Sequence, residues 1–497
     1  MKIRIVLLCF LAFQFFSCDI IIESSGEQQY DPSRPDYPTR TFWAVDFTNN
    51  RNYQLEAELL VDGLYCKIWA EMGANLSEND ARRVANTYDN TIYPRMMDAF
   101  GIKGNITDDG VTIIARDIME FASWLVDGDG KLSILLLNIR DGFKPGVSET
   151  LLAGYFWGGN FFENDPASSS FRYSNETDMI YINLNPQMPP GSMASNKTIA
   201  HELQHLMNFV STFITGRTGL MDTWIDEGLS ASAEWVVSGS QDTNYVAWFN
   251  NDPSEMIRRG NNFFVWDNHS NNPNAIIDEY ATVYLFFQWL RLQAGSNGIF
   301  YNIISSSYHD HRAVTRAMNS AVPGRAYDNW ETLLRTWLAA NYINATSGPF
   351  GYMNDSALRN IQARTVPGGT TNLNLAPGEG VFSITAQGFS IPAQGVNIRY
   401  AGLNRSSPWL SDNSIFPGGA LLSFNVNTDI NGRTESGRTT GLAASEEIVL
   451  DDHSRQLLLS SRPFVISAAD MLRRNGHEEN SFTNLPSTAL FSIIDDE

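Results

Sequence analysis

The stretch 197-KTIAHELQHLMNF-209 contains two histidines four positions apart, with a glutamate directly after the first. On an α-helix, residues four apart lie on one face, so His201 and His205 can point two imidazoles at one ion. Zinc binds neutral imidazole nitrogen and prefers four tetrahedral ligands. Glu202 could reach a water molecule at that ion without binding the metal. The stretch therefore predicts a helix that binds one zinc ion, with Glu202 as a general base.

The neighbours of the two histidines favour a buried helix. A surface helix that carried two histidines by chance would place charged residues around them, and here there are almost none. No proline interrupts residues 196–209. The uncharged neighbours are Thr198, Ile199, Leu203, Leu206 and Met207. We therefore expect a buried helix in which only the metal-binding face is polar.

A catalytic zinc site needs a third protein ligand and an open fourth position. The third histidine of the metzincin pattern would stand at position 211, which is serine, so that class is excluded. The next helical stretch, 222-DTWIDEGLSASAEW-235, offers Asp226, Glu227 and Glu234. Without the neighbouring histidine motif, Asp226 and Glu227 would be interpreted as favourable charges at a helix N-terminus. Glu227 and Glu234 are separated by roughly 10 Å along one helix, so they cannot both bind one ion.

The two segments together carry a family resemblance. HELQHLMNF followed by WIDEGLSASAE resembles the hyicolysin family of secreted bacterial metallopeptidases. The segment WIDEGLS is similar, more distantly, to one in aminopeptidase-N-like enzymes. Both groups are gluzincins, in which a glutamate on the second helix is the third zinc ligand. The resemblance is sharp over about residues 197–235, extends over about 40–345 and does not inform the C-terminal region. It implies that His201, His205 and Glu227 bind zinc and that Glu202 is the base.

Glu227 is preferred to Glu234 as the ligand because of its neighbour Gly228. A residue without a side chain would let this helix approach the HELQH helix closely. Glu234 lies two turns further on, where we expect a supporting or buried role. The thermolysin pattern has an aspartate four residues after the ligand glutamate, but Ala231 stands there. The residue that orients His201 is therefore not identified from the sequence.

A further group is needed to stabilise the oxyanion formed during peptide hydrolysis. The segment 280-YATVYLFFQWL-290 resembles the helix that supplies a tyrosine for this purpose in aminopeptidase-like enzymes. Tyr280 is at the matching position and Tyr284 lies one turn further on, although simple core packing of an aromatic helix is the alternative. His309 and His311 are rivals for the role. The glycine-x-methionine-glutamate-asparagine motif that anchors a free amino terminus in aminopeptidases is absent, which favours an endopeptidase.

The N-terminus has the character of a targeting segment. Lys2 and Arg4 precede an apolar run over residues 5–16, which is shorter than the roughly 20 residues that span a bilayer. The run ends in 15-FFSC-18, which resembles a bacterial lipoprotein signal with Cys18 as the lipidated residue. A plain secretory signal is the alternative. The polar residues 19–40 would then be a tether, and the protein would be lipid-anchored to a membrane in the bacterial cell envelope.

Composition limits the remaining possibilities. With 34 basic and 55 acidic residues, the formal net charge is −21. The chain has no basic stripe, so nucleic acid is excluded as a partner. Of three cysteines, Cys9 would leave with the signal and Cys18 would carry lipid, so Cys66 would remain alone and no disulfide framework is expected.

Patterning along the chain predicts an α+β protein. A capping-box start at Ser77 and Asp80 precedes apolar residues at every fourth position up to Phe100, which predicts a helix that Pro94 could kink. Residues 151–177 suit a long loop, and 127-DGDGK-131 predicts a turn in preference to a calcium loop. Strands are expected at 42–47, 53–61, 64–72, 111–118, 132–139 and 179–184, and again at 381–386, 396–401 and 420–426.

The expected organisation begins with a signal peptide (1–18) and a tether (19–40). A small N-terminal β region (41–76), a gluzincin-type zincin catalytic domain (77–350) and a C-terminal β-rich domain (351–497) follow. The expected function is zinc-dependent hydrolysis of internal bonds in a peptide or protein substrate. Two alternatives remain open: a non-catalytic surface adhesin that keeps the fold, and a zinc hydrolase or aminopeptidase with another substrate.

Overall fold

The computed structural model describes residues 36–430 and 463–467, with short internal gaps. The gaps are residues 75, 102, 109–110, 145–149, 168–170, 186–187, 215–219, 254–256, 261–262, 267–274, 364, 368–374, 385–388, 405–414 and 417–418. The predicted signal peptide, Cys18 and most of the predicted tether lie outside the described residues.

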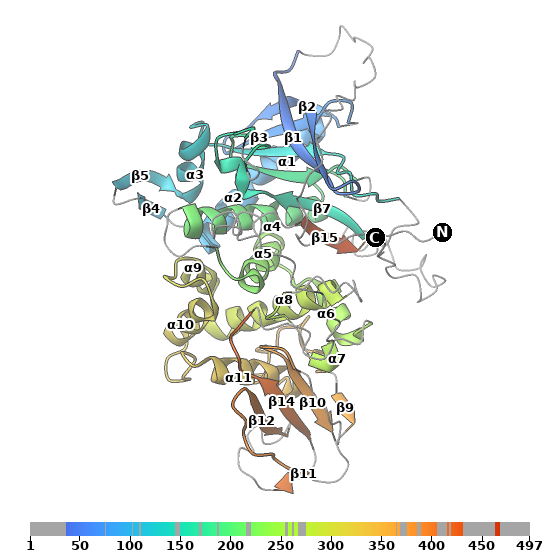
Figure 1. The fold of residues 1–497 in the computed structure, drawn as a ribbon, viewed down its shortest axis with the longest axis vertical. Helices are drawn as coiled ribbons and strands as arrows, with labels where there is room; N and C mark the ends of the chain where they lie inside the picture. The colour runs from blue at the N-terminus through green and yellow to red at the C-terminus, as the bar shows by residue number, and fades with distance from the viewer. Residues whose placement is uncertain are drawn as a thin grey trace. The chain divides into compact units, whose positions relative to one another are not determined.

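The chain divides into two compact units, and both mix helices with strands (Figure 1). The first unit comprises Met1–Leu220, Val236–Ser238 and Leu450–Glu497, and the second comprises Met221–Trp235 and Gly239–Val449. The mixed α and β character predicted from the sequence is confirmed. The domain boundaries proposed from the sequence stay predictions.

The first unit is built on a seven-stranded sheet of order β1-β2-β3-β6-β8-β7-β15. Strands β3, β6 and β8 run parallel, whereas β1, β2, β7 and β15 each pair antiparallel with their neighbours. The strands are β1 (Thr39–Asp46), β2 (Arg51–Asp62), β3 (Cys66–Glu71), β6 (Leu132–Leu137), β7 (Thr150–Phe156), β8 (Met179–Asn183) and β15 (Pro463–Ser467). The strands of residues 41–76 are therefore part of the same sheet as β6 and β8. A separate hairpin pairs β4 (Lys103–Asp108) with β5 (Val111–Asp117).

The core of this unit lies on the central strands. Every residue of β6 and of β8 is buried, as expected for strands that are covered on both faces. On one face, Tyr155 and Tyr181 stack with ring centroids 4.1 Å apart, within a cluster that also includes Phe42, Leu135 and Leu152. Cys66 is buried, and within the described part of the chain it is a free cysteine.

The predicted helix after Ser77 forms, with one irregularity. The Ser77–Asp80 capping box is present, and α1 (Glu78–Thr87) leads through a π-helical turn (Tyr88–Ile92) into α2 (Tyr93–Ala99). Pro94 follows this wide turn, which suits a residue that lacks a backbone N–H. The apolar residues at every fourth position are all fully buried: Val84, Tyr88, Ile92, Met96 and Phe100.

The predicted loop over residues 151–177 is wrong at its beginning. Strand β7 (Thr150–Phe156) and a short 3₁₀ turn (Gly158–Phe161) occupy that part of the segment. Glycine and aromatic residues here suggested a loop, but six consecutive buried residues from Leu151 to Phe156 make a strand enclosed by neighbouring elements. The remaining elements of the first unit are α3 (Ile118–Val126) and α4 (Met193–Phe209), which is followed by a π-helical turn (Val210–Ile214).

The second unit combines helices with a small sheet. A four-stranded sheet has the order β12-β14-β10-β9, and it confirms the strands predicted near residues 381, 396 and 420. Its helices, with the end of α5 shared with the first unit, are α5 (Thr223–Ser238), α6 (Thr243–Asn251), α7 (Ile257–Gly260), α8 (Ala275–Ala294), α9 (Gly298–Ile304), α10 (His311–Ala321) and α11 (Trp330–Ile343). Its strands are β9 (Thr365–Pro367), β10 (Gly380–Ile384), β12 (Ile398–Leu403) and β14 (Ala420–Asn425), besides a short pair of β11 (Phe389–Ser390) with β13 (Ile415–Phe416). Over the described parts of both units, no helix has the length and apolar character that would let it cross a membrane.

Candidate metal centre

The HELQH sequence lies in α4, which is a buried helix. Ser192 caps its N-terminus by accepting a hydrogen bond from the Ser195 N–H at 3.2 Å. Every residue from Ala194 to Phe209 is buried, so the expectation of a buried helix is confirmed. The helix lies against β7 and β8 of the large sheet. This packing holds the polar motif inside the protein.

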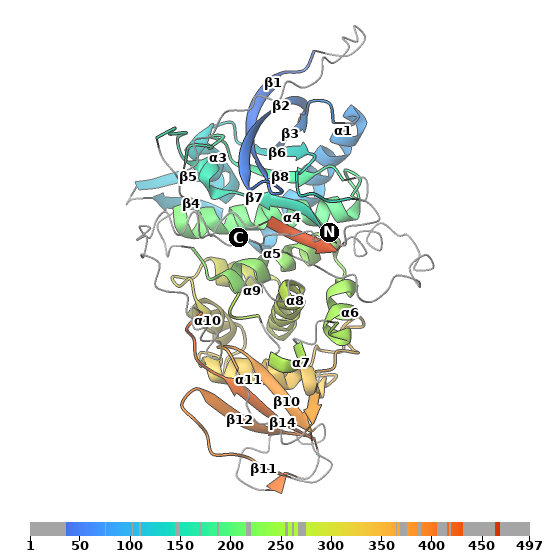
Figure 2. The ribbon, with the colours of Figure 1, turned by 45° about the vertical axis from the view of Figure 1, so that its right-hand side comes forward.

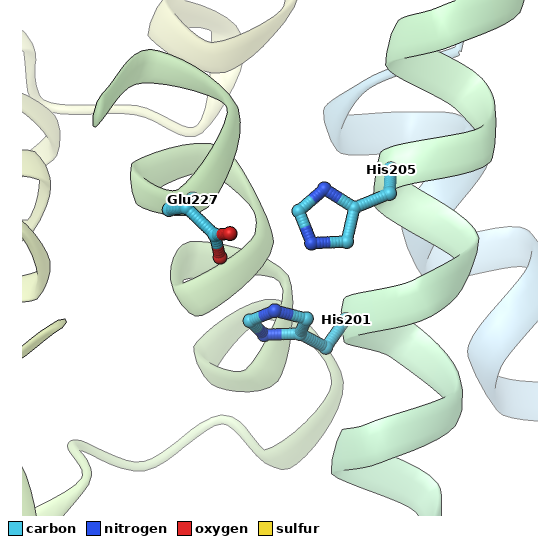
Figure 3. A group of neighbouring side chains, drawn as sticks. All are labelled: His201, His205 and Glu227. Carbon is cyan, nitrogen blue, oxygen red and sulfur yellow. The ribbon is translucent and has the colours of Figure 1, made fainter. Parts of the chain in front are cut away.

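Three buried side chains converge beside α4. The rings of His201 and His205 project from one face of the helix, with centroids 4.9 Å apart and planes at 72°. A carboxylate oxygen of Glu227, from α5, lies near them, and one ligand atom from each of the three residues lies within 4.8 Å of the other two (Figure 3). The exposed fractions are 0% for His201, 5% for His205 and 1% for Glu227. Among the described residues, this is the group of histidine, cysteine and acidic side chains that could hold a metal ion.

The chemistry of this group fits zinc. Two imidazole nitrogens and one carboxylate oxygen are a donor set that zinc accepts, and three protein ligands leave a fourth position for water or substrate. Calcium and magnesium prefer oxygen ligands, so they fit a group with two imidazoles poorly. Burial of the charged Glu227 carboxylate also costs free energy unless a cation or hydrogen bonds balance its charge.

Glu202 is fully buried on α4, next to strand β7. A Cβ atom added to Gly154 of β7 would lie 3.2 Å from Glu202 Cγ and 3.0 Å from Thr198 Cγ2. Burial raises the pKa of the β7 residue Tyr155, and the charge of Glu202 contributes a small part of that rise. β7 was not predicted from the sequence to be part of this site. The signal that could have found it is Gly154 within a run of apolar residues, because a glycine in a strand often marks a close approach of other groups.

The expected role of Gly228 is wrong. Instead of opening space for the HELQH helix, Gly228 makes room for Phe287 of α8: an added Cβ would lie 2.3 Å from Phe287 Cε2. The next nearest atoms also belong to that ring. Close packing of α5 against α8 therefore requires the glycine. The nature of the side chain at residue 228 thus says nothing about Glu227 as a ligand.

Glu234 is fully buried on α5 but does not belong to the three-residue group. It lies near Tyr284 of α8. Burial raises the pKa of the Tyr284 hydroxyl, and the charges of Asp242 and, to a smaller extent, Glu234 add to that rise. This placement agrees with the supporting, buried role that the sequence predicts for Glu234. Asp226 lies in the first turn of α5 and is partly exposed.

The two tyrosines proposed for the oxyanion both lie in α8 and are buried. Tyr284 donates from its hydroxyl to Gln241 Oε1 at 2.6 Å and accepts from the Asp242 N–H at 2.8 Å. This hydroxyl is therefore used in holding α6 to α8. Tyr280 is 4% exposed and its ring packs edge-on against Trp266, with centroids 5.1 Å apart. Its assignment to the oxyanion stays a prediction.

The two rival histidines lie at the start of α10. The His309 carbonyl accepts a hydrogen bond from the Asp222 N–H at 2.8 Å. His311 is the first residue of α10, and its ring packs on Trp330 with centroids 5.8 Å apart. Burial lowers the pKa of His311, and the neighbouring Asp310 opposes that change.

Asp222 immediately precedes α5, the helix that carries Glu227. Its pKa is raised to about 7, first by burial and then by the negative charge of Asp310. The sequence analysis missed this residue, because an aspartate before a helix is normally favoured in its charged form. Only the tertiary neighbours reverse that tendency.

The DGDGK segment forms the turn that the sequence predicts. Asp127 ends α3 and accepts a hydrogen bond from the Thr177 hydroxyl at 2.7 Å. Asp129 forms an ion pair with Lys67 and accepts from the Lys131 N–H at 2.8 Å. The carboxylates of Asp127 and Asp129 are therefore bonded to other groups of the protein.

Comparison with known proteins finds similarity to a metalloprotease. The chain is 24% identical over 290 residues to the neutral metalloprotease ShpI of Staphylococcus hyicus. The match covers 57% of this chain and 58% of that protein, so the chain spans little more than half the length of this relative. No family model matches the chain. The similarity supports a distant relationship to a metalloprotease family.

Proposed function

We propose that this protein is a zinc-dependent metallopeptidase of the gluzincin type that cleaves internal peptide bonds. The observation that carries the proposal is the convergence of ligand atoms from His201, His205 and Glu227 within 4.8 Å, in a buried position. Similarity to a neutral metalloprotease supports the same function.

The three residues would hold one zinc ion per chain. His201 and His205 contribute imidazole nitrogens from successive turns of α4, and Glu227 contributes a carboxylate oxygen from α5. When bound, zinc would polarise the carbonyl of the peptide bond and make a water molecule more acidic.

Glu202 would act as the general base. It directly follows His201 on α4 and is not a member of the three-residue group, which suits a base that acts beside the metal and does not bind it. One carboxylate oxygen accepts the proton of the attacking water, and the leaving amine takes that proton as the bond breaks. Such general acid–base catalysis typically contributes about 10²–10⁴ in rate.

Tyr280 would donate a hydrogen bond to the oxyanion. The proposal rests on its position in the α8 segment that resembles the tyrosine-bearing helix of aminopeptidase-like enzymes, whereas the Tyr284 hydroxyl is bonded to Gln241 and Asp242. In a Tyr280→Phe variant, turnover should fall while the zinc content stays at one per chain.

We also propose that the protein is exported and lipid-anchored through Cys18. This proposal rests on the sequence 15-FFSC-18 and on the polar residues that follow it. The substrate would then be a peptide or protein outside the cytoplasm.

The decisive experiment incubates the purified chain with a mixed peptide library, with a chelator, and with zinc restored after chelation. Cleavage at internal bonds that stops with the chelator and returns with zinc supports the proposal. Trimming from the amino terminus would indicate an aminopeptidase instead. Absence of cleavage in zinc-loaded protein would contradict peptidase activity and favour the adhesin or a hydrolase with another substrate.

A further inference from the structure

A strand from the C-terminal part of the chain forms one edge of the large sheet. Residues Pro463–Ser467 (β15) pair antiparallel with β7. Figure 2 shows β15 beside β7, next to α4. The sequence predicts a separate C-terminal domain over residues 351–497, and a strand from there in this sheet was not predicted.

β7 packs directly against Glu202. A Cβ on Gly154 would lie 3.2 Å from Glu202 Cγ, and Gly154 is directly opposite Phe464 in the ladder between β7 and β15. The backbone of β15 therefore runs past the part of the sheet that contacts the proposed general base.

Both edges of β7 are paired in this arrangement. Gly154, Tyr155 and Phe156 pair with β8 on one side, and the other side pairs with β15. An extended peptide commonly binds a protein by adding a strand to an exposed sheet edge. The other terminal strand of the sheet, β1, is separated from β7 by β2, β3, β6 and β8. Beside Glu202, the position that an added peptide strand would take is thus filled by this chain's own residues.

The pairing between β15 and β7 has features of a strand contact that can separate. It covers five residues of β15, and its register shifts between Phe464 and Val465, which leaves Ala153 of β7 in a bulge. A bulge leaves one residue unpaired and disrupts the ladder locally. Pro463 begins the strand, where its missing N–H costs least. β15 is also a short edge strand that pairs with β7 alone among the strands of this sheet.

We propose that residues 463–467 are an autoinhibitory strand that occupies the peptide-binding edge of β7. A peptide substrate in extended conformation must displace β15 before it can lie alongside Glu202. This inference rests on the proposed peptidase function, because it assigns the occupied edge to the substrate of that reaction.

The first test weakens the strand without touching the metal-binding residues. Val465→Pro removes a backbone N–H and should disfavour pairing with β7, whereas Val465→Thr keeps the N–H and a β-branched side chain. With zinc content unchanged, we expect kcat/KM for a short peptide to rise several-fold in Val465→Pro and to stay unchanged in Val465→Thr. Hydrogen exchange of the β7 amides should also become faster in Val465→Pro alone.

The second test locks the strand in place. Thr150 and Ser467 are directly opposite each other. Opposite residues in an antiparallel pair have Cα atoms about 4.5–5.5 Å apart, within the distance that a disulfide spans. In the double variant Thr150→Cys with Ser467→Cys, oxidation should abolish peptide cleavage, and a phosphine reductant should restore it. Each single variant is the control, and Cys66 should interfere little because burial raises the pKa of its thiol.

A binding measurement separates failure of this inference from failure of the proposed function. In the zinc-loaded Glu202→Gln background, the oxidised double-cysteine variant should bind a library-derived peptide at least ten-fold more weakly than its reduced form. If locking weakens peptide binding but no variant cleaves any peptide, the inference holds and the peptidase function fails. Equal cleavage or equal peptide binding by the locked and unlocked forms would overturn the inference, as would the absence of measurable binding in the unlocked form.

Discussion

Gly154 of β7 lies directly against Glu202 of α4: a Cβ on Gly154 would lie 3.2 Å from Glu202 Cγ and 2.8 Å from the backbone carbonyl oxygen of Tyr181. The side-chain atom could yield, but the carbonyl belongs to the neighbouring strand β8. The absence of a side chain at residue 154 is therefore required for β7 to reach both β8 and the helix that carries the histidines.

Replacement of this glycine should disturb both stability and activity. We expect Gly154→Ala to lower the free energy of unfolding by about 1–3 kcal/mol, the usual cost of an overpacked core. Cleavage of a test peptide should also fall, because Glu202 must move. The control is Gly298→Ala in α9, where the nearest atom to an added Cβ is Ser296 Oγ at 3.3 Å. An unchanged denaturation midpoint in Gly154→Ala would show that the sheet can move away from α4.

Separate roles for the metal ligands and the base can be tested by zinc analysis. Glu202→Gln should keep close to one zinc per chain and lose about 10²–10⁴ in turnover, because only the proton acceptor is removed. His205→Ala should lose both zinc and turnover. Near-normal peptidase activity in Glu202→Gln would remove this mechanism from consideration.

The choice between the two buried glutamates of α5 can be tested in the same way. Glu227 belongs to the three-residue group and Glu234 does not. We expect Glu227→Ala to weaken zinc binding severely, and Glu234→Ala to keep zinc but unfold at a lower temperature. Metal analysis of both purified variants decides the assignment. Full zinc in Glu227→Ala with none in Glu234→Ala would reverse it.

The raised pKa of Asp222 predicts a pH-dependent loss of stability. The folded chain holds this proton up to about pH 7, whereas an unfolded aspartate releases it near its ordinary pKa of 3.8. Because the folded state binds more protons between these values, the free energy of unfolding falls as pH rises from about 4 to 7 and stays reduced above that range.

Asp222→Asn should remove this effect. The difference in thermal midpoint, variant minus unsubstituted chain, should increase from pH 4 to pH 7 and level off above about pH 8. Asp328→Asn, at an exposed carboxylate, controls for the removal of one negative charge. A difference that is constant across this pH range would show that Asp222 ionises in the folded protein as it does in the unfolded chain.

The proposed lipid anchor can be tested by phase partitioning. The chain with Cys18 should enter the detergent phase, and Cys18→Ala should move to the soluble fraction or remain as uncleaved precursor. Metabolic labelling with a fatty acid gives a second readout. If the unsubstituted protein is fully soluble and unlabelled, the anchor proposal fails.

Local patterns in the sequence predicted the elements whose causes are local. The capping box at Ser77 and Asp80 sets the start of α1, and largely apolar runs produce the buried strands β6 and β8. The spacing of His201 and His205 places both rings on one face of α4 through helix geometry alone. None of these features depends on distant residues.

Strand β7 was missed because its causes are not local. Glycine and aromatic residues suggested a loop, and only burial between β8, β15 and α4 makes the segment a strand. Gly228 was misinterpreted for a similar reason: a sequence indicates that a side chain is absent, but not that Phe287 fills the space.

The sequence by itself determined which residue types could bind a metal and that two of them share a helix face. The tertiary structure decided that Glu227, and not Glu234, lies with those histidines, and that Asp222 is half-buried near Asp310. It also decided that residues 463–467 pair with β7, more than 300 residues earlier in the chain. The physical reason is that metal coordination, burial of charge and strand pairing depend on distances between groups far apart in sequence, and these distances exist only once the chain has folded.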